Sequence, residues 1–170
     1  LLRRKPQVGG FTPDERGFVD LNDLLDAVTR LFKGGCSRDE VLEMVLNDTE
    51  RFEVRDGLIR ARYGHSYPVH IGSPLRPDEV PELLYHGTTA RSASRILREG
   101  LMPMRRECVH LSLTRERAIE VARRRRGPHA LLKVRARELA RVEPIYRASN
   151  LTFLVRKVPL NILRWSGSDG

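Results

Sequence analysis

A stretch rich in proline and glycine near the middle of the chain constrains its fold more than any other feature. Residues 71–81 read IGSPLRPDEVP, and their three prolines and one glycine prevent regular secondary structure over this span. A chain of 170 residues divided at this point has room for two small hydrophobic cores. We therefore predict two domains, residues 1–75 and residues 76–170.

The first half has the pattern of two helices followed by a β-hairpin. Leucine and valine recur at helical spacing behind Asp20, a residue type that caps helices, and Ser37 and Glu40 form the capping-box pattern that begins a second helix. Asp56-Gly57 is a dipeptide typical of tight hairpins. The predicted elements are a helix from Leu21 that Gly34 and Gly35 end, a helix from Ser37 through Leu46, and strands over residues 52–55 and 58–63. This order resembles a winged helix, a module that often binds nucleic acid.

The second half has a mixed pattern of short alternating strands and amphipathic helices. The predicted elements are strands at residues 83–86, 109–112, 130–134, 145–146 and 151–155, and helices at residues 90–98 and 115–126. Gly127-Pro128 should end the second helix, with the arginines of residues 123–126 in its last turn, where cations complement the helix dipole. The fold class predicted for the whole chain is α+β.

The net charge of +9 is unevenly distributed along the chain. Residues 1–80 hold 12 Lys and Arg against 14 Asp and Glu, whereas residues 81–170 hold 19 against 8. A basic second half rich in arginine indicates a polyanionic partner, because guanidinium groups bind phosphate in a bidentate way. A solvated arginine-rich surface, as thermophiles carry, is the alternative interpretation. The slightly acidic first half would then be a scaffold that presents a few basic side chains.

Several classes of protein are excluded by what the sequence lacks. It has no apolar run near the roughly 20 residues that span a bilayer, and Cys36 and Cys108 fit neither a disulfide framework nor a zinc motif. The five histidines lack metal-ligand spacing, and no Gly-x-Ser-x-Gly, Walker or Gly-x-Gly-x-x-Gly motif is present. The chain begins without Met, so its first residues do not tell whether the protein carries a targeting signal. We expect a cytoplasmic, metal-free monomer.

Two short polar segments are candidates for a ligand site. In residues 85–89, Gly87 allows a ligand to approach the backbone, and the segment leads into a helix whose N-terminal amides favour anions. The alternative is a threonine-capped helix behind a turn. In Val109-His110-Leu111-Ser112, alternation puts His110 and Ser112 on one face, as in any half-buried strand.

The order of these segments resembles the RNA 2′-phosphotransferase family. The motifs that carry the resemblance are Gly17-Phe18-Val19-Asp20-Leu21, Ile59-Arg60-Ala61-Arg62-Tyr63-Gly64-His65-Ser66, Leu84-Tyr85-His86-Gly87-Thr88, residues 96–106, Val109-His110-Leu111-Ser112, Arg125-Arg126-Gly127, Ser149-Asn150-Leu151 and Val158-Pro159. They cover nearly the whole chain, and several motifs in order are far more specific than any one of them.

The resemblance implies a winged-helix lobe joined to an ADP-ribosyltransferase-like lobe that binds NAD⁺ without a Rossmann motif, with RNA between them. In this family the RNA 2′-phosphate attacks the nicotinamide ribose of NAD⁺ and expels nicotinamide. The ribose 2″-hydroxyl then attacks the phosphorus, and the products are 2′-hydroxyl RNA and ADP-ribose 1″,2″-cyclic phosphate. The natural RNA substrate stays open, either a tRNA splice junction or another RNA with a 2′-phosphate.

The resemblance also assigns a phosphate clamp of arginines and one histidine. Arg3, Arg60 and Arg125 match its three arginines, with Arg124 open as an alternative to Arg125. Arg4 stands where the family has histidine. Since the pKa of arginine lies above about 12, Arg4 can contact phosphate but cannot exchange protons near neutral pH, and we expect it to act as an electrostatic substitute.

By the same resemblance, six residues should bind NAD⁺. They are His86, Gly87, Thr88, His110, Ser112 and Thr152. Backbone groups near Gly87 should contact the nicotinamide amide, and His86 should lie near the adenosine-side ribose. His110 and Ser112 should flank nicotinamide and its ribose. No glutamate of the protein-modifying ADP-ribosyltransferases stands there, which fits an acceptor phosphate that is already ionised.

Two other functions are compatible with parts of this sequence. A non-enzymatic winged-helix regulator would need its basic charge in the first half, whereas the charge lies after residue 80. An ADP-ribosyltransferase acting on a terminal phosphate of a nucleic acid, or on a protein, would use the same cleft and stop after the first step.

Overall fold

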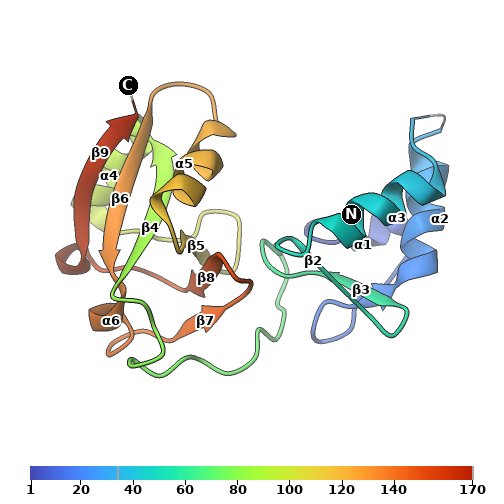
Figure 1. Ribbon diagram of the computed structural model, residues 1–170, viewed down its shortest axis with the longest axis horizontal. Helices are drawn as coiled ribbons and strands as arrows, with labels where there is room; N and C mark the ends of the chain where they lie inside the picture. Colours follow the sequence, from blue (N-terminus) through green and yellow to red (C-terminus); the bar gives the residue numbers. More distant parts are fainter. Residues whose placement is uncertain (34, 170) are drawn as a thin grey trace. The chain divides into compact units, whose positions relative to one another are not determined.

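The computed structural model describes residues 1–33 and 35–169, which form two compact units, Leu1–Ile71 (unit 1) and Gly72 to the end of the chain (unit 2) (Figure 1). Each unit combines helices with an antiparallel sheet, so the predicted α+β class is confirmed. The predicted boundary after residue 75 lies in the same coil segment as the division between the units. None of the helices in the described ranges is long and apolar enough to cross a bilayer.

Unit 1 consists of helices around a three-stranded sheet. Its elements are α1 Pro6–Gly9, β1 Val19–Asp20, α2 Leu21–Leu31, α3 Arg38–Asn47, β2 Phe52–Arg55 and β3 Leu58–Ala61. The strand order is β1-β3-β2, and both pairings are antiparallel. The two predicted helices and the hairpin are therefore confirmed. The helix α2 ends at Leu31 with Phe32 as its C-cap, before the predicted Gly34, which lies outside the described residues.

Local signals in the sequence account for the ends of these elements. The Asp20 carboxylate accepts hydrogen bonds from the backbone N–H groups of Asn22 and Asp23. Ser37 and Glu40 form a complete capping box at the start of α3. Asp56 and Gly57 both adopt positive φ, at 51° and 74°, as a two-residue hairpin turn requires. The hairpin register therefore follows from the turn, and it buries Ile59 completely.

Unit 2 is built on a six-stranded antiparallel sheet with the order β7-β8-β5-β4-β6-β9 (Figure 1). Its elements are β4 Leu83–Thr89, α4 Ala90–Glu99, β5 Val109–Ser112, α5 Arg115–Arg123, β6 His129–Arg135, α6 Ala136–Leu139, β7 Ile145–Arg147, β8 Thr152–Val155, the 3₁₀ turn η1 Leu160–Ile162 and β9 Leu163–Asp169. The main hydrophobic cluster joins Leu84 and Leu132 of the sheet to Ala93 and Ile96 of α4.

Two parts of the second half differ from the sequence prediction. The helix α5 ends at Arg123, with Arg124 as its C-cap, so the prediction that residues 124–126 belong to its last turn is wrong. After the helix, the carbonyl of Arg125 accepts a hydrogen bond from Nε2 of His129 at 2.9 Å. The strand β9 was not predicted, although it pairs with β6 along most of its length.

Candidate active site

Two of the predicted phosphate-binding arginines of unit 1 lie around a buried histidine, His65. The guanidinium carbon of Arg3 lies 4.9 Å from the ring centroid of Tyr63, and Arg60 projects from β3. Burial, followed by the positive charges of Arg3 and Arg60, lowers the pKa of His65 to about 4. Structure thus brings Arg3, Arg60 and a neutral imidazole together, although 57 positions separate the two arginines in the sequence.

The N-terminal segment is attached to the loop that follows β3. The Tyr67 hydroxyl donates to the carbonyl of Leu2 at 2.6 Å, and the Ser66 N–H donates to the carbonyl of Arg3 at 2.9 Å. These bonds position Arg3 beside His65. Gly17, with φ of 81°, lies against the imidazole, and a Cβ at this position would lie 3.3 Å from its Nε2.

Arg4 lies differently from Arg3. Its side chain is exposed and forms no hydrogen bond or ion pair with any residue that the structure describes. Its backbone N–H donates a hydrogen bond to the Leu1 carbonyl at 3.3 Å. The structure therefore places Arg3, but not Arg4, beside His65.

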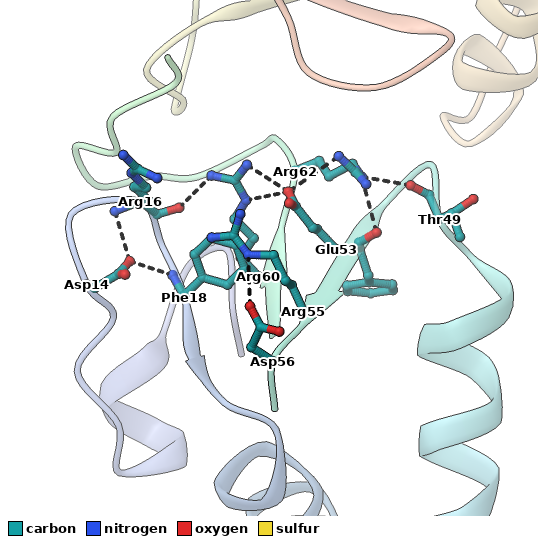
Figure 2. Close-up of polar contacts among 10 residues, drawn as sticks. Asp14, Arg16, Phe18, Thr49, Glu53, Arg55, Asp56, Arg60 and Arg62 are labelled. Carbon is teal, nitrogen blue, oxygen red and sulfur yellow. Dashed lines mark hydrogen bonds and ion pairs between the residues drawn. The ribbon is translucent and has the colours of Figure 1, made fainter. Parts of the chain in front are cut away.

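Arg60 is oriented by a carboxylate and by an aromatic ring (Figure 2). Its Nε and Nη2 lie 2.9 Å and 2.7 Å from Oε2 of Glu53, and its Nη1 donates to the carbonyl of Arg16 at 3.1 Å. The guanidinium carbon lies 4.6 Å from the ring centroid of Phe18. With its side chain held on three sides, Arg60 presents a fixed cation.

In unit 2, the central strands β4 and β5 separate after a single pair. Among the described residues they register only at Tyr85 and Ser112, whereas β4 and β6 register at seven pairs. The His86 side chain bridges the separation, with Nδ1 3.0 Å from the carbonyl oxygen of His110. Because a carbonyl can only accept, Nδ1 of His86 carries the hydrogen.

His86 is held in its neutral form. Burial lowers its pKa to about 4, the hydrogen bond to His110 opposes this effect, and the charge of Arg125 lowers the pKa further. With Nδ1 as the donor, Nε2 of neutral His86 is a hydrogen-bond acceptor. Of the arginines at residues 123–126, Arg125 is the one whose charge contributes to the lowered pKa of His86.

The remaining predicted NAD⁺ residues lie on both faces of the sheet at this separation. Ser112 is registered with both Tyr85 and Thr152, so alternation places His110, Ser112 and Thr152 on the face that Gly87 shares. His86 and Thr88 belong to the opposite face. Ser112, Thr152 and Thr88 are buried.

Gly87 has a packing role of its own. A Cβ added there would lie 1.8 Å from the carbonyl oxygen of Ala118 in α5 and 3.2 Å from the Cβ of Ala122. Glycine at this position lets α5 lie directly on β4. Thr89, rather than Thr88, caps α4 by accepting a hydrogen bond from the Ser92 N–H. The Thr88 hydroxyl is buried and has no hydrogen-bond partner among the described residues.

His110 is oriented by Arg106, a residue that the site prediction did not include. Nη1 of Arg106 lies 2.9 Å from Nδ1 of His110, and since a guanidinium only donates, Nδ1 is the acceptor. A neutral His110 then carries its hydrogen on Nε2. His86 and His110 thus present opposite polarity at their Nε2 atoms, one an acceptor and the other a donor.

Some features of the structure lie apart from these residues. A shallow pocket between α5 and the strands β6 and β9 contains none of the predicted NAD⁺ residues; its lining is Arg115, Ile119, Ala122, His129, Ala130, Leu131 and Gly167. Over residues 1–33 and 35–169, no three His, Cys, Asp or Glu side chains gather as metal ligands.

The site prediction missed His65 and Glu53, and signals for both are present in the sequence. His65 belongs to one of the motifs that carry the family resemblance. Glu53 could have been found from the hairpin, because a two-residue turn at Asp56-Gly57 pairs residue 53 with residue 60 across the strands.

Comparison with known proteins gives one consistent family. A family model described as RNA 2′-phosphotransferase, Tpt1 / KptA family, matches residues 1–157. A Pyrococcus abyssi protein named "Probable RNA 2′-phosphotransferase" is 38% identical over 165 residues, which cover 96% of this chain and 88% of that protein.

The similarity extends to other archaea and to bacteria. A protein with the same name from Thermococcus kodakarensis is 40% identical over 161 residues, covering 94% of this chain and 88% of that protein. A protein with this name from Streptomyces coelicolor is 40% identical over 166 residues, which cover 96% of this chain and 89% of that protein.

Proposed function

Since the chain belongs to the RNA 2′-phosphotransferase, Tpt1 / KptA family, we propose that it is an NAD⁺-dependent transferase that removes an internal 2′-phosphate from RNA, such as tRNA. The proposed products are 2′-hydroxyl RNA, nicotinamide and ADP-ribose 1″,2″-cyclic phosphate. In this proposal unit 1 is a winged-helix lobe and unit 2 an ADP-ribosyltransferase-like lobe.

The observation that carries the proposal is the grouping of Arg3 and Arg60 around neutral His65. A 2′-phosphate is a dianion near neutral pH, and two guanidinium groups match its charge without needing to titrate. Because Glu53 and Phe18 already hold Arg60, little conformational entropy is lost when the phosphate binds. Arg125, whose charge lowers the pKa of His86 in unit 2, is the third arginine proposed to act in catalysis.

The separated strands of unit 2 have donors and acceptors that suit a dinucleotide. The acceptor at Nε2 of His86 fits a ribose hydroxyl, and the buried Thr88 hydroxyl has hydrogen-bonding capacity unused among the described residues. Gly87, His110, Ser112 and Thr152 complete the proposed NAD⁺ residues. When bound there, NAD⁺ supplies an electrophilic ribosyl carbon with nicotinamide as its leaving group.

The protein's own groups orient the phosphate and neutralise its charge. Arg3 and Arg60 hold the phosphate oxygens, and Arg4 adds positive charge without exchanging protons. No carboxylate is needed as a base, because the attacking phosphate oxygen is already ionised. The largest contribution to the rate in such a site comes from fixed electrostatics and alignment.

The test is incubation of the full chain with NAD⁺ and an oligonucleotide that bears one internal 2′-phosphate. Formation of ADP-ribose cyclic phosphate with 2′-hydroxyl RNA is the expected result. A stable ADP-ribosylated strand would instead support the alternative, an ADP-ribosyltransferase of nucleic-acid phosphates. Absence of nicotinamide release with any phosphorylated RNA would overturn both. Arg60→Gln is the control for activity that depends on the site.

A further inference from the structure

The outer face of the unit 1 hairpin carries three arginines, two of which contact the Glu53 carboxylate and one of which is ion-paired with Asp56. Alternation puts Glu53 and Arg55 of β2 on the same face as Arg60 of β3, opposite the buried Ile59. Arg62 continues this face two residues after Arg60, and its N–H donates to the Arg51 carbonyl at 2.9 Å. We name Arg55, Arg60, Arg62 and Glu53 the arginine face.

This concentration of charge is local. Residues 1–71 contain 11 Lys and Arg against 12 Asp and Glu, a net charge of −1. Three arginines on one face, with Glu53 between two of them and Asp56 3.7 Å from Nε of Arg55, therefore do not reflect a generally basic unit. The resulting positive potential is a property of this sheet face.

Contacts with neighbouring groups fix the three arginines (Figure 2). Nε of Arg62 donates to the carbonyls of Thr49 and Phe52 at 2.8 Å and 3.2 Å, and its Nη1 lies 3.4 Å from Oε2 of Glu53. The same Glu53 oxygen binds Arg60. Arg55 and Arg60 both lie against the Phe18 ring, at 5.4 Å and 4.6 Å from its centroid.

The contacts leave donors for a ligand. A guanidinium has five N–H groups. The contacts of Arg60 with Glu53 and with the Arg16 carbonyl engage three of them and leave one on each Nη atom. Arg62 engages its Nε and one N–H of Nη1. Both arginines therefore hold unused donors in a fixed orientation, which is the arrangement that bidentate binding of phosphate needs.

We propose that the arginine face binds backbone phosphates of the RNA beside the 2′-phosphate. In this arrangement Arg55 and Arg62 contact the backbone and Glu53 positions Arg60. The inference rests on the proposed function and deepens it. A nucleic-acid backbone fits better than a protein partner, because interfaces with nucleic acids are strongly positive and guanidinium groups with two free N–H donors match phosphate oxygens.

The first experiment measures binding without chemistry. The full chain is titrated with a single-stranded RNA octamer that has only 2′-hydroxyls, without NAD⁺, at several salt concentrations. Each phosphate contact adds about 0.7 to the slope of log K against log salt for single strands, so Arg55→Gln and Arg62→Gln should each lower the slope by about 0.7. With equal affinities of variant and wild type at 1 M salt, the same relation predicts binding weakened about 8-fold at 50 mM salt and about 3-fold at 200 mM.

The matched control is Arg38→Gln, which removes the same charge from α3. Arg38 is exposed and ion-paired with Asp26, and it does not belong to the arginine face. Its slope should equal that of the wild type. Arg55 has a side chain 56% exposed, so its substitution tests the proposal without disturbing the core. Wild-type slopes for both Arg55→Gln and Arg62→Gln would overturn the proposal.

A second experiment separates positioning from charge. Glu53→Gln removes a negative charge, so binding of the 2′-hydroxyl octamer should stay equal or become tighter. Turnover of the 2′-phosphorylated strand should nevertheless fall about 10- to 100-fold, because Arg60 is no longer held in place. A parallel fall in binding and turnover, or unchanged turnover, would contradict the positioning role.

The two proposals fail in distinguishable ways. If nicotinamide is never released but the salt slopes change, the arginine face binds RNA and the proposed function is wrong. If nicotinamide is released but the slopes stay at the wild-type value, the proposed function stands and the arginine face is wrong.

Discussion

Single residues of the candidate site combine fixed cations with neutral imidazoles. Burial, followed by the positive charges of Arg3 and Arg60, lowers the pKa of His65 and keeps its imidazole neutral. His86 is neutral for a related reason, because burial and the charge of Arg125 act in the same direction. Under the proposed function, the cations beside His65 would bind the 2′-phosphate in its ionised form, and the first step of the reaction would need no proton carrier.

The exposed Arg4 tests whether a proton carrier would improve the site. Arg4→His should raise kcat at pH 7 by at least about tenfold, because an imidazole can exchange protons near neutral pH and a guanidinium cannot. Nicotinamide release with a 2′-phosphorylated oligonucleotide gives the measurement, and Lys5→His, at the neighbouring exposed position, is the control. An unchanged kcat for Arg4→His would place Arg4 outside the chemistry.

His65 should make the stability of unit 1 depend on pH. Its pKa is about 4 in the folded state and about 6.5 when unfolded, so the unfolded chain binds more protons between these values. The stabilisation is present above pH 6.5 and is lost as the pH falls towards 4, by up to about 3 kcal/mol at 1.36 kcal/mol for each pKa unit.

Native-state hydrogen exchange of the β3 amides at pH 4.5 and pH 7 measures this loss. His65→Gln should show a smaller difference between the two pH values than the wild type. His70→Gln, which removes an exposed histidine of the same unit, should keep the full difference. Equal pH dependence in His65→Gln and the wild type would show that His65 does not titrate as expected.

At the scale of elements, the contact of α5 with β4 depends on Gly87. Gly87→Ala places a Cβ 1.8 Å from the Ala118 carbonyl oxygen, so the helix must move. We expect a loss of about 2–3 kcal/mol in the free energy of unfolding, as for other overpacked cores. The fluorescence of Trp165, which lies on β9, reports the unfolding of unit 2 during denaturant titration. Gly35→Ala, whose Cβ meets nothing closer than 3.4 Å, should change stability by less than about 1 kcal/mol.

The separation of β4 and β5 allows the structural and binding roles of His86 to be told apart. His86→Asn keeps an N–H that can reach the His110 carbonyl but removes Nε2. We expect stability close to that of the wild type and a KM for NAD⁺ raised about tenfold, the value of one hydrogen bond. His86→Ala should lose stability as well. A wild-type KM in His86→Asn would limit His86 to its structural role.

The elements also show which parts of the fold the sequence could predict. Asp20, Ser37 and Asp56-Gly57 act through neighbours within a few residues, and they set α2, α3 and the hairpin as predicted. Gly127-Pro128 marks only the latest point at which α5 can end, so the sequence left its end at Arg123 undetermined. The strand β9 lies at the sheet edge with a register shift opposite Leu131 and Leu132, so it lacks the alternation of a half-buried strand.

The candidate site also has a part that the sequence could predict and a part that it could not. The family motifs led to Arg3 and Arg60, but their approach depends on Tyr67 and Ser66 binding the N-terminal segment, a contact between distant parts of the sequence. The charge effect of Arg3 on His65 follows from that contact, because the Arg3 carbonyl accepts hydrogen bonds from Ser66, the residue after His65. Glu53 was predictable from the hairpin register alone.

For the whole molecule, the distribution of charge sets how substrate length affects activity. Residues 72–170 hold 20 Lys and Arg against 10 Asp and Glu, and unit 1 adds its arginine face. A longer RNA places more phosphates within reach of these cations and releases more counterions on binding. If the arginine-rich surface only contacts solvent, activity should not depend on the length of the RNA.

We therefore expect KM to fall from a 2′-phosphorylated dinucleotide to a tetranucleotide and an octanucleotide at about 0.05 M salt, with kcat unchanged. The difference should disappear at about 0.5 M salt, where exposed charges are screened within a few ångströms. Steady-state nicotinamide release at both salt concentrations measures the effect, and a neutral methylphosphonate extension of the same length is the control. An equal KM for all three lengths at low salt would show that only the 2′-phosphate and its nearest neighbours are bound, and that the surplus arginines face solvent.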